Sequence, residues 1–337
     1  MTSQHTNLDS PWPHRLAVLL ACATFPLIWV GGLVTTYDAG MAVPDWPSTY
    51  GYNLFAYPWQ TWLFGPWDLF IEHGHRLLGA LVGFIAIAFG CVVWRNDRRV
   101  GMRAASCGAL ALVVIQGVLG GTRVLFDARQ LAMVHGCVGP AFFAYCVALT
   151  VYTSRKFAMT EPHASELHPQ RLHRLSLLTV VFAYLQLIIG AQLRHVSVMA
   201  TPGVFRGAVV FHLLMAVIVT FHAFQLLIVV KQHYSAVHGL QFPVVLLAAL
   251  VLIQVALGGA TWVAKYGWPE FFADYAFAAP HTIQAKSLLQ GLVVTSHVAT
   301  GSLVLAASVT TFARSLRLVR VPSVALGSSA LMMELAT

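Results

Sequence analysis

The sequence predicts an all-α polytopic membrane protein with eight membrane-spanning helices. Three observations lead to this prediction: composition, a series of long apolar runs, and an internal repeat. Hydrophobic residues make up 58% of the 337-residue chain and charged residues only 9%, whereas about a quarter of the residues are charged in an average soluble domain. Such a chain can bury its apolar surface only in a lipid bilayer.

Each expected helix corresponds to one apolar run of the sequence. The runs cover residues 16–36, 69–94, 104–125, 131–153, 175–195, 207–230, 243–264 and 288–313. Each reaches the ~20 residues that cross ~30 Å of hydrocarbon. No small-residue cleavage site follows the first run, so we expect it to be a retained span and not a removed signal peptide.

The charge distribution predicts the orientation of these helices. Lys and Arg are about twice as frequent in the connections on the N-terminal side of the membrane as in those on the other side, and cytoplasmic loops carry such an excess. We therefore expect both termini in the cytoplasm, in a bacterial-type inner membrane. The net charge of +8 is accounted for in this way, and we expect no nucleic-acid partner. The five cysteines all lie within apolar runs without a C-x-x-C pair, which is typical of packing residues.

The chain repeats itself. Gln116–Thr122 (QGVLGGT) matches Gln254–Ala260 (QVALGGA) at an offset of 138 (254 − 116), and His75 matches His212 at 137 (212 − 75). An even number of helices per unit preserves orientation. The repeat therefore predicts two tandem four-helix bundles, related by a pseudo-twofold axis along the membrane normal.

The expected division of the chain follows this repeat. We assign residues 1–156 to an N-terminal half, 157–174 to a cytoplasmic linker, 175–320 to a C-terminal half and 321–337 to a tail. The glycine pairs within the repeated segments favour close helix packing. The alternative is direct contact with a flat macrocycle, which also needs a surface without side chains.

Four histidines lie within the spans at similar depth. His75, His135, His212 and His297 fall on the even-numbered helices, two in each half, ~8–15 Å below the expected outer boundary at a rise of 1.5 Å per residue. Facing helices of a four-helix bundle present inward ligands to a cofactor. The spacing therefore predicts axial ligation of one haem in each half.

Other interpretations of these histidines stay open. A single intramembrane histidine is most often a hydrogen-bonded packing residue, and proton relays also use such histidines. A copper or zinc transport site requires ligands that converge on one point, often including a carboxylate or thiolate. Only Glu72 is near, and in one half alone. A proton relay does not explain the duplication.

Cations near the outer ends of the helices are candidates for binding haem propionates, with arginine preferred where a planar bidentate pair can form. They are Arg76, Arg123, Arg194, Arg206 and Lys286. The alternative for each is an interfacial side chain that extends its charge into the headgroup region.

The two halves differ beside their first histidine. Glu72 precedes His75 by three residues and can share its helix face, whereas Val209 occupies the matching place before His212. A carboxylate beside one haem is a candidate general base or cation stabiliser. We therefore expect one reactive site in the first half and one electron-transfer site in the second.

Three motifs carry a resemblance to a known family: Glu72-x-x-His75-Arg76, the loop Gly40–Pro47 (GMAVPDWP) and Gly190–His195 (GAQLRH). Together they resemble the haem A synthases of cytochrome oxidase assembly. The resemblance implies oxidation of a ring methyl of haem O to a formyl group through successive hydroxylations, with haem A as product.

The resemblance also implies a role for each site residue. His75 and His135 would face the substrate haem, His212 and His297 would ligate the iron of a haem b that relays electrons, and Glu72 would be the catalytic carboxylate. Implied partners are the lipid bilayer, a haem O synthase and an electron donor that no motif identifies; a homo-oligomer is also compatible.

The chain departs from the family at one point, because many bacterial members carry a cysteine pair in the first outer loop and residues 37–68 contain none. A thiol–disulfide relay at that loop is therefore in doubt. The runner-up function is a dihaem b-type electron carrier or haem-handling assembly factor without chemistry on the macrocycle.

Overall fold

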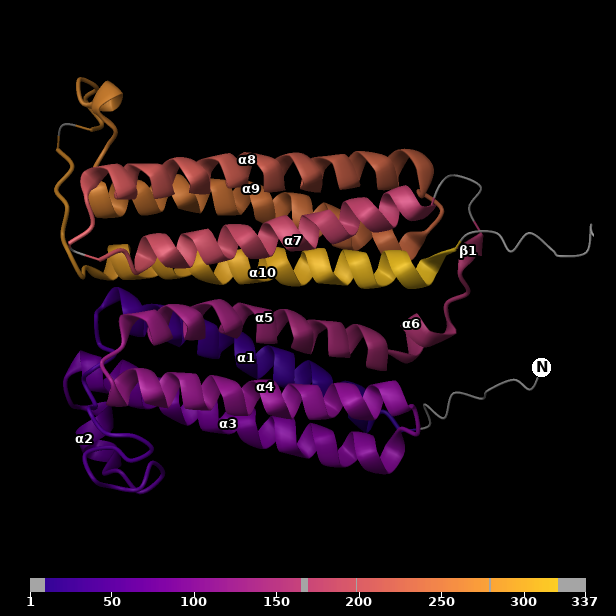
Figure 1. Ribbon diagram of the computed structural model, residues 1–337, viewed down its shortest axis with the longest axis horizontal. Coiled ribbons are helices and arrows are strands. Elements are labelled where there is room, and N and C mark those ends of the chain that lie inside the picture. The colour runs from indigo at the N-terminus through magenta and orange to yellow at the C-terminus, as the bar shows by residue number, and fades with distance from the viewer. Residues whose placement is uncertain (1–9, 165–168, 198, 279, 321–337) are drawn as a thin grey trace, which may run out of the picture.

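The computed structural model describes residues 10–164, 169–197, 199–278 and 280–320. Its long helices run side by side, so that their ends lie at two opposite ends of the molecule (Figure 1). In chain order the elements are α1 (Trp12–Thr36), α2 (Trp59–Leu63), α3 (Trp67–Asn96), α4 (Val100–Leu125), α5 (Arg129–Thr153), α6 (Arg155–Met159), β1 (His163–Ala164), α7 (Pro169–Arg194), α8 (Pro202–His233), α9 (His238–Tyr266), the 3₁₀ turn η1 (Glu270–Phe272), α10 (Leu288–Leu318) and β2 (Val319–Arg320).

Within the described residues, eight helices are long and apolar enough to cross a membrane: α1, α3, α4, α5, α7, α8, α9 and α10. They contain 25 to 32 residues each. At a rise of 1.5 Å per residue, even the shortest exceeds the ~30 Å hydrocarbon core. The predicted eight-helix membrane fold is confirmed.

Several helices extend beyond the apolar runs that predicted them. α7 begins at Pro169 and not at residue 175, and α8 begins at Pro202 and not at residue 207. Proline suits the first helical position, where the missing N–H would have no partner. The polar first turn of α7 is also packed, because a ring nitrogen of His173 contacts the carbonyl of Ser315 at 3.0 Å. The expected linker 157–174 thus contains the end of α6 and the start of α7, and the expected tail 321–337 lies outside the described residues.

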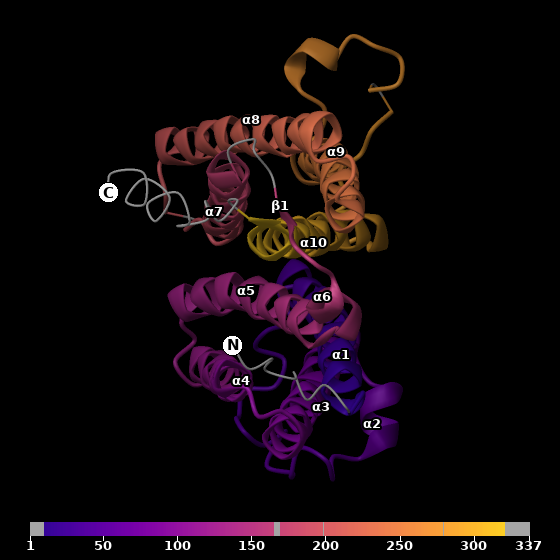
Figure 2. The same cartoon turned by 90° about the vertical axis from the view of Figure 1, so that its right-hand side faces the viewer.

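The long helices pack in two groups of four, and Figure 2 shows these groups side by side. α1, α3, α4 and α5 pack in a ring, each against two neighbours, and α7, α8, α9 and α10 repeat this arrangement. The two groups meet where α10 packs against α1 and α5, and where α5 packs against α7. The pseudo-twofold axis itself stays a prediction.

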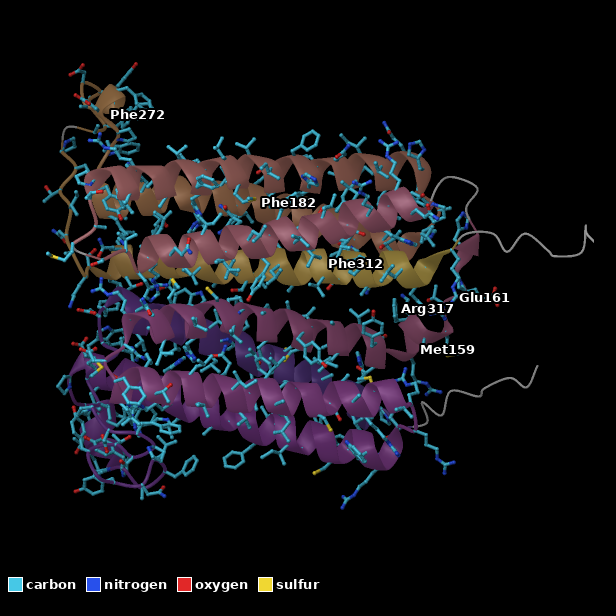
Figure 3. The ribbon with its side chains drawn as sticks, in the orientation of Figure 1. Met159, Glu161, Phe182, Phe272, Phe312 and Arg317 are labelled. Carbon is cyan, nitrogen blue, oxygen red and sulfur yellow. The ribbon has the colours of Figure 1, made fainter. Side chains whose placement is uncertain are left out.

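α10 lies at this junction because its surface is built from small residues. Ser302, Ser308 and Thr311 are fully buried, and each hydroxyl donates to the carbonyl four residues earlier. Small side chains with internally satisfied hydroxyls allow close helix approach in apolar surroundings. At one end of the bundle, Arg317 of α10 donates to the carbonyl of Ala158 at 3.0 Å, which ties the second group to α6 (Figure 3).

Candidate functional site

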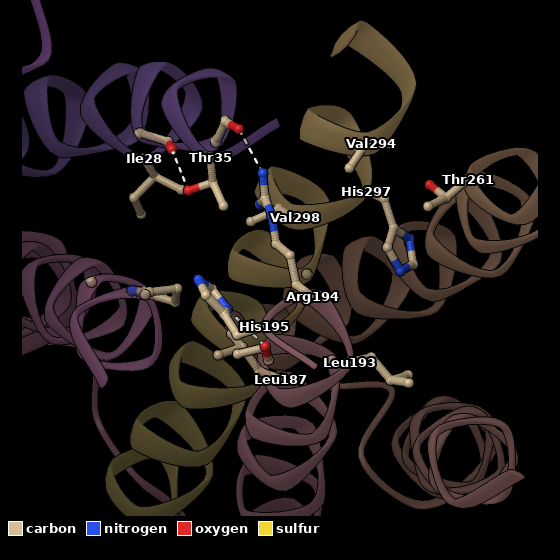
Figure 4. A pocket seen from close by; sticks show the side chains of 18 of the residues that line it. Ile28, Thr35, Leu187, Leu193, Arg194, His195, Thr261, Val294, His297 and Val298 are labelled. Atoms are coloured by element: carbon tan, nitrogen blue, oxygen red, sulfur yellow. Dashed lines mark hydrogen bonds between the residues drawn. The ribbon is translucent and has the colours of Figure 1, made fainter. Parts of the chain in front are cut away.

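A large cavity of about 1470 Å³ lies within the helix bundle. All eight long helices contribute to its walls, and most of the lining residues are apolar. The four predicted histidines line it, together with Glu72, Arg76, Arg123 and Arg194. Figure 4 shows His297 and Arg194 among the helices that surround this space.

The four histidines face one another in two pairs. The ring centroids of His75 on α3 and His135 on α5 lie 6.3 Å apart, with an angle of 88° between the ring planes. Those of His212 on α8 and His297 on α10 lie 6.4 Å apart, at 72°. In each group the two helices that carry the histidines are diagonal to one another, so each pair points across the centre of its ring of four.

Each imidazole lies against a glycine of a neighbouring helix. A Cβ atom added to Gly31, Gly120, Gly190 or Gly258 would come within 2.8, 3.2, 3.0 or 3.3 Å of the Cε1 atom of a histidine. The partners are, in that order, His75, His135, His212 and His297. At these positions the glycines make room for imidazole rings, which differs from the close helix packing that the sequence favoured.

The residue four positions before each of these glycines also lies near the ring. Backbone carbonyls of Leu27, Gln116 and Gln254 face three of the rings, and the side chain of Gln186 contacts Nε2 of His212 at 3.3 Å. The Nδ1 atoms of all four histidines are buried without a well-formed hydrogen bond. The sites thus repeat in detail, and each leaves imidazole nitrogens for a further partner.

The paired imidazoles fit an iron between them. A metal–imidazole bond measures about 2.0–2.1 Å, so two such bonds plus two ring radii span roughly 6 Å between ring centres, close to both observed separations. Across the described part of the chain, no three His, Cys, Asp or Glu residues form a group suited to a metal ion. Two opposed imidazoles in an apolar cavity are the ligand set of a bis-histidine haem.

A network of charges beside the first pair distinguishes the two halves. Glu72 is 2% exposed; its Oε1 atom accepts from Nη2 of Arg76 at 2.9 Å and lies 3.9 Å from Nη2 of Arg123. Its Oε2 atom accepts from the Val43 amide at 3.2 Å. The carboxylate is therefore fixed in position at the cavity wall.

The second half has no such network at the matching positions. The repeat offsets place Val209, Leu213 and Thr261 where the first half has Glu72, Arg76 and Arg123, and all three line the cavity. Only the first half can therefore present a charged group beside its histidine pair at these positions.

Two of the expected propionate-binding arginines hold the loop between α1 and α2. Arg76 donates to the carbonyls of Asp45 at 2.6 Å, Ser48 at 2.9 Å and Val43 at 2.7 Å. Arg123 donates to the carbonyl of Gly40 at 2.8 Å. These bonds fix the loop between α1 and α2 against the wall of the cavity, next to Glu72.

The same loop is ordered by its own polar side chains. The carboxylate of Asp45 accepts from the amides of Tyr50 and Gly51, both at 2.8 Å, and from the hydroxyl of Ser48. Burial alone would raise the pKa of Asp45, but these hydrogen bonds outweigh it, and the pKa lies below its usual value. His73 of α3 is buried and contacts Thr49 at 3.0 Å, so it packs against this loop and is not among the residues that line the cavity.

The remaining predicted cations have different places. Arg194 donates to the carbonyl of Gly32 at 2.6 Å and to the hydroxyl of Thr36 at 2.7 Å, and so reaches from α7 to α1 (Figure 4). Arg206 and Lys286 are exposed and are not among the residues that line the cavity.

Four further residues line the cavity that were not predicted as site residues: Trp46, His195, Lys265 and His281. Trp46 lies in the loop motif that carried the family resemblance, which was the available signal. Lys265 and His281 lie at and beyond the end of α9, where the repeat offers no matching segment.

Comparisons with known proteins agree with the motifs. Residues 66–202 match the model of a family described as cytochrome oxidase assembly protein. This segment includes Glu72 and the first histidine pair, and it ends before His212.

Named relatives cover different shares of the chain. A heme A synthase of Halalkalibacterium halodurans is 24% identical over 247 residues, which is 68% of this chain and 79% of the relative. A heme A synthase of Ruegeria pomeroyi is 31% identical over 125 residues, 35% of this chain and 32% of the relative. A protoheme IX farnesyltransferase of Halobacterium salinarum is 30% identical over 141 residues, 41% of this chain and 29% of the relative.

The chain thus spans less than a third of the Halobacterium and Ruegeria relatives and most of the Halalkalibacterium one. The family match and the relatives named heme A synthase together support the resemblance predicted from the sequence, and they relate this chain to the haem A synthases among the cytochrome oxidase assembly proteins.

Proposed function

We propose that this chain is a membrane haem A synthase, which oxidises a ring methyl of haem O to a formyl group by successive hydroxylations. In this proposal the part of the cavity between His75 and His135, the first site, binds the substrate haem. The part between His212 and His297, the second site, binds a haem b. The relatives named heme A synthase support a role in haem A biosynthesis.

One observation carries the proposal beyond a general haem protein. The two histidine pairs have nearly the same geometry, and each of the four imidazoles lies against a glycine of a neighbouring helix. Among the described residues, however, only the first pair has a fixed carboxylate beside it. Two electron-transfer haems would not need this difference. A reactive site paired with a relay site requires it.

The residues of the first site then have defined tasks. Each hydroxylation replaces a C–H bond of the methyl group with a C–OH bond: water supplies the oxygen, and two protons and one electron pair leave, the electrons one at a time through the second site to an electron partner outside this chain. Loss of water after the second hydroxylation gives the formyl group. Glu72 accepts the proton released at the methyl carbon or stabilises positive charge that develops there. Arg76 and the Val43 amide hold its two oxygens so that no reorientation is needed during the reaction.

The second site has a simpler task. A haem b bound there supplies one-electron redox chemistry. His212 and His297 would hold it, and the apolar residues Val209 and Leu213 line the cavity beside them. The proposal extends to a cytoplasmic location of both termini, haem sites toward the outer side, and a haem O synthase as the supplier of substrate.

Pigment analysis tests the proposal. The purified protein, expressed with a source of haem O, is expected to yield haem A or its alcohol intermediate together with haem b. Glu72→Gln is expected to abolish the oxidised products and retain haem b. Recovery of haem b alone from the wild type, with no change in Glu72→Gln, would favour the dihaem carrier, and a colourless protein would exclude both functions.

A further inference from the structure

Trp46 is part of the wall of the first site. Its indole lies over Gly121 of α4, where an added Cβ would come within 2.7 Å of three ring carbons. The preceding residue, Gly120, lies against the imidazole of His135. Trp46 also lines the cavity itself. The indole of Trp46 therefore contacts α4 at the residue that follows the contact with His135.

The matching position in the second half is open. Gly259 follows Gly258, which lies against the imidazole of His297. Gly121 follows Gly120 in the same way in the first half. Among the described residues, no heavy atom outside its own helix and its chain neighbours lies within 4 Å of a Cβ added to Gly259. The same point of the repeat is thus filled by an aromatic ring in the first half and free in the second.

The backbone on both sides of Trp46 is held in place. Arg76 binds the carbonyls of Asp45 and Ser48, and the carboxylate of Asp45 closes the following turn onto Gly51. Arg76 in turn pairs with Glu72. The position of the indole is therefore coupled to that of the carboxylate.

We propose that Trp46 is the positioning residue that selects which edge of the substrate macrocycle lies beside Glu72. The inference rests on the proposed function and deepens it. A relay site can hold a macrocycle in more than one in-plane orientation, and its wall is open at Gly259. A reactive site must bring one ring methyl to one carboxylate, and a rigid ring on Gly121 blocks the orientations that would place another edge there.

The test is the regiochemistry of oxidation. Full-length protein with bound haem b is supplied with haem O, and the products are separated by chromatography and identified by mass and NMR. Wild type is expected to give one formyl isomer. Trp46→Ala is expected to give isomers oxidised at more than one ring methyl, or a fall in kcat of about tenfold or more with KM little changed.

Two further variants separate orientation from folding. Trp46→Phe keeps a planar ring over Gly121 and is expected to restore the single isomer and at least part of kcat. Trp59→Ala removes an exposed tryptophan beyond the same loop and is the matched control, with wild-type products expected. A normal b-type spectrum in each variant shows that the second half is intact.

The inference fails if Trp46→Ala makes the single wild-type isomer with kcat within about twofold. It also fails if Trp46→Phe is as impaired as Trp46→Ala, because the shape of the ring would then be irrelevant. Wild-type protein that leaves haem O unchanged refutes the proposed function itself. Conversion by the wild type together with either of the first two results refutes only the role of Trp46.

Discussion

Gly190 lies directly against the imidazole of His212, where an added Cβ would be 3.0 Å from Cε1. Gly31, Gly120 and Gly258 stand in the same relation to the other three histidines. The absence of a side chain at these glycines therefore sets the orientation of the rings. This relation can be tested without changing any histidine.

Gly190→Ala is expected to push the His212 ring away from α7 and to weaken haem b binding. Alanine is itself favoured over glycine in a helix by roughly 1 kcal/mol, so any loss reflects the contact and not helix propensity. The measurement is the haem b content per chain, from the absorption spectrum of the purified protein. Gly207→Ala is the matched control, because in the part of the chain that the structure describes no atom beyond its own helix backbone and chain neighbours lies within 4 Å of a Cβ added there. Equal haem content in the two variants would contradict the role of Gly190 in orienting the His212 ring.

The division of labour between the histidine pairs predicts different outcomes for their removal. His212→Ala or His297→Ala is expected to abolish the b-type spectrum, because one imidazole of the second pair is lost. His75→Ala is expected to retain that spectrum and to stop product formation. The measurements are the reduced-minus-oxidised spectrum and the extracted pigments. Normal haem b in both second-half variants would contradict the assignment of the two sites.

Much of the fold was accessible from the sequence because lipid imposes a simple rule. A span must be apolar over about 20 residues, and all eight runs became helices. The ends were less accessible, since polar first turns such as that of α7 fall outside an apolar window. There the start at Pro169 depends on packing against α10, which composition does not reveal.

The histidine pairs were also accessible, because the repeat placed them two per half. The groups that the arginines bind could not be predicted from the sequence. Arg76 and Arg123 were expected to meet propionates, but a nearby loop offers backbone carbonyls that the sequence cannot place. The role of Trp46 was hidden for the same reason. Its partner, Gly121, is distant in sequence and belongs to another element.

Asp45 makes the loop between α1 and α2 sensitive to acid. Its pKa lies below the usual value of 3.8, because hydrogen bonds from Gly51, Ser48 and Tyr50 outweigh the effect of burial. The unfolded loop therefore binds a proton more readily than the folded one. The contribution of Asp45 to loop stability is complete well above pH 3.8 and is lost as pH falls through the lowered pKa.

Hydrogen exchange measures this loss. Protection factors of the Tyr50 and Gly51 amides, corrected for intrinsic rates at each pH, are expected to fall below about pH 4. In Asp45→Asn the side chain does not titrate, so the same pH step should be absent. An identical step in that variant would assign the acid sensitivity to another group.

Arg194 joins the two halves of the molecule. It extends from α7 to α1, where it donates to the Gly32 carbonyl and the Thr36 hydroxyl. Gly32 follows Gly31, which lies against the imidazole of His75. The bond from Arg194 to the Gly32 carbonyl therefore also fixes the backbone beside the first histidine pair. Hydrogen bonds from a charged donor contribute about 1.5–3 kcal/mol each. Arg194→Gln is therefore expected to lower the free energy of unfolding by roughly 2 kcal/mol or more.

Arg206→Gln is the matched control, because this arginine is exposed and does not line the cavity. A thermal unfolding series of the two variants in detergent compares them, with a lower midpoint expected only for Arg194→Gln. The b-type spectrum separates two roles of Arg194. If it only joins the helices, the spectrum of the folded variant stays unchanged; if it also pairs with a propionate, the haem b content or its potential changes together with stability. An unfolding midpoint equal to that of Arg206→Gln would exclude the joining role, since loss of two bonds between α7 and α1 must weaken the contact between the halves.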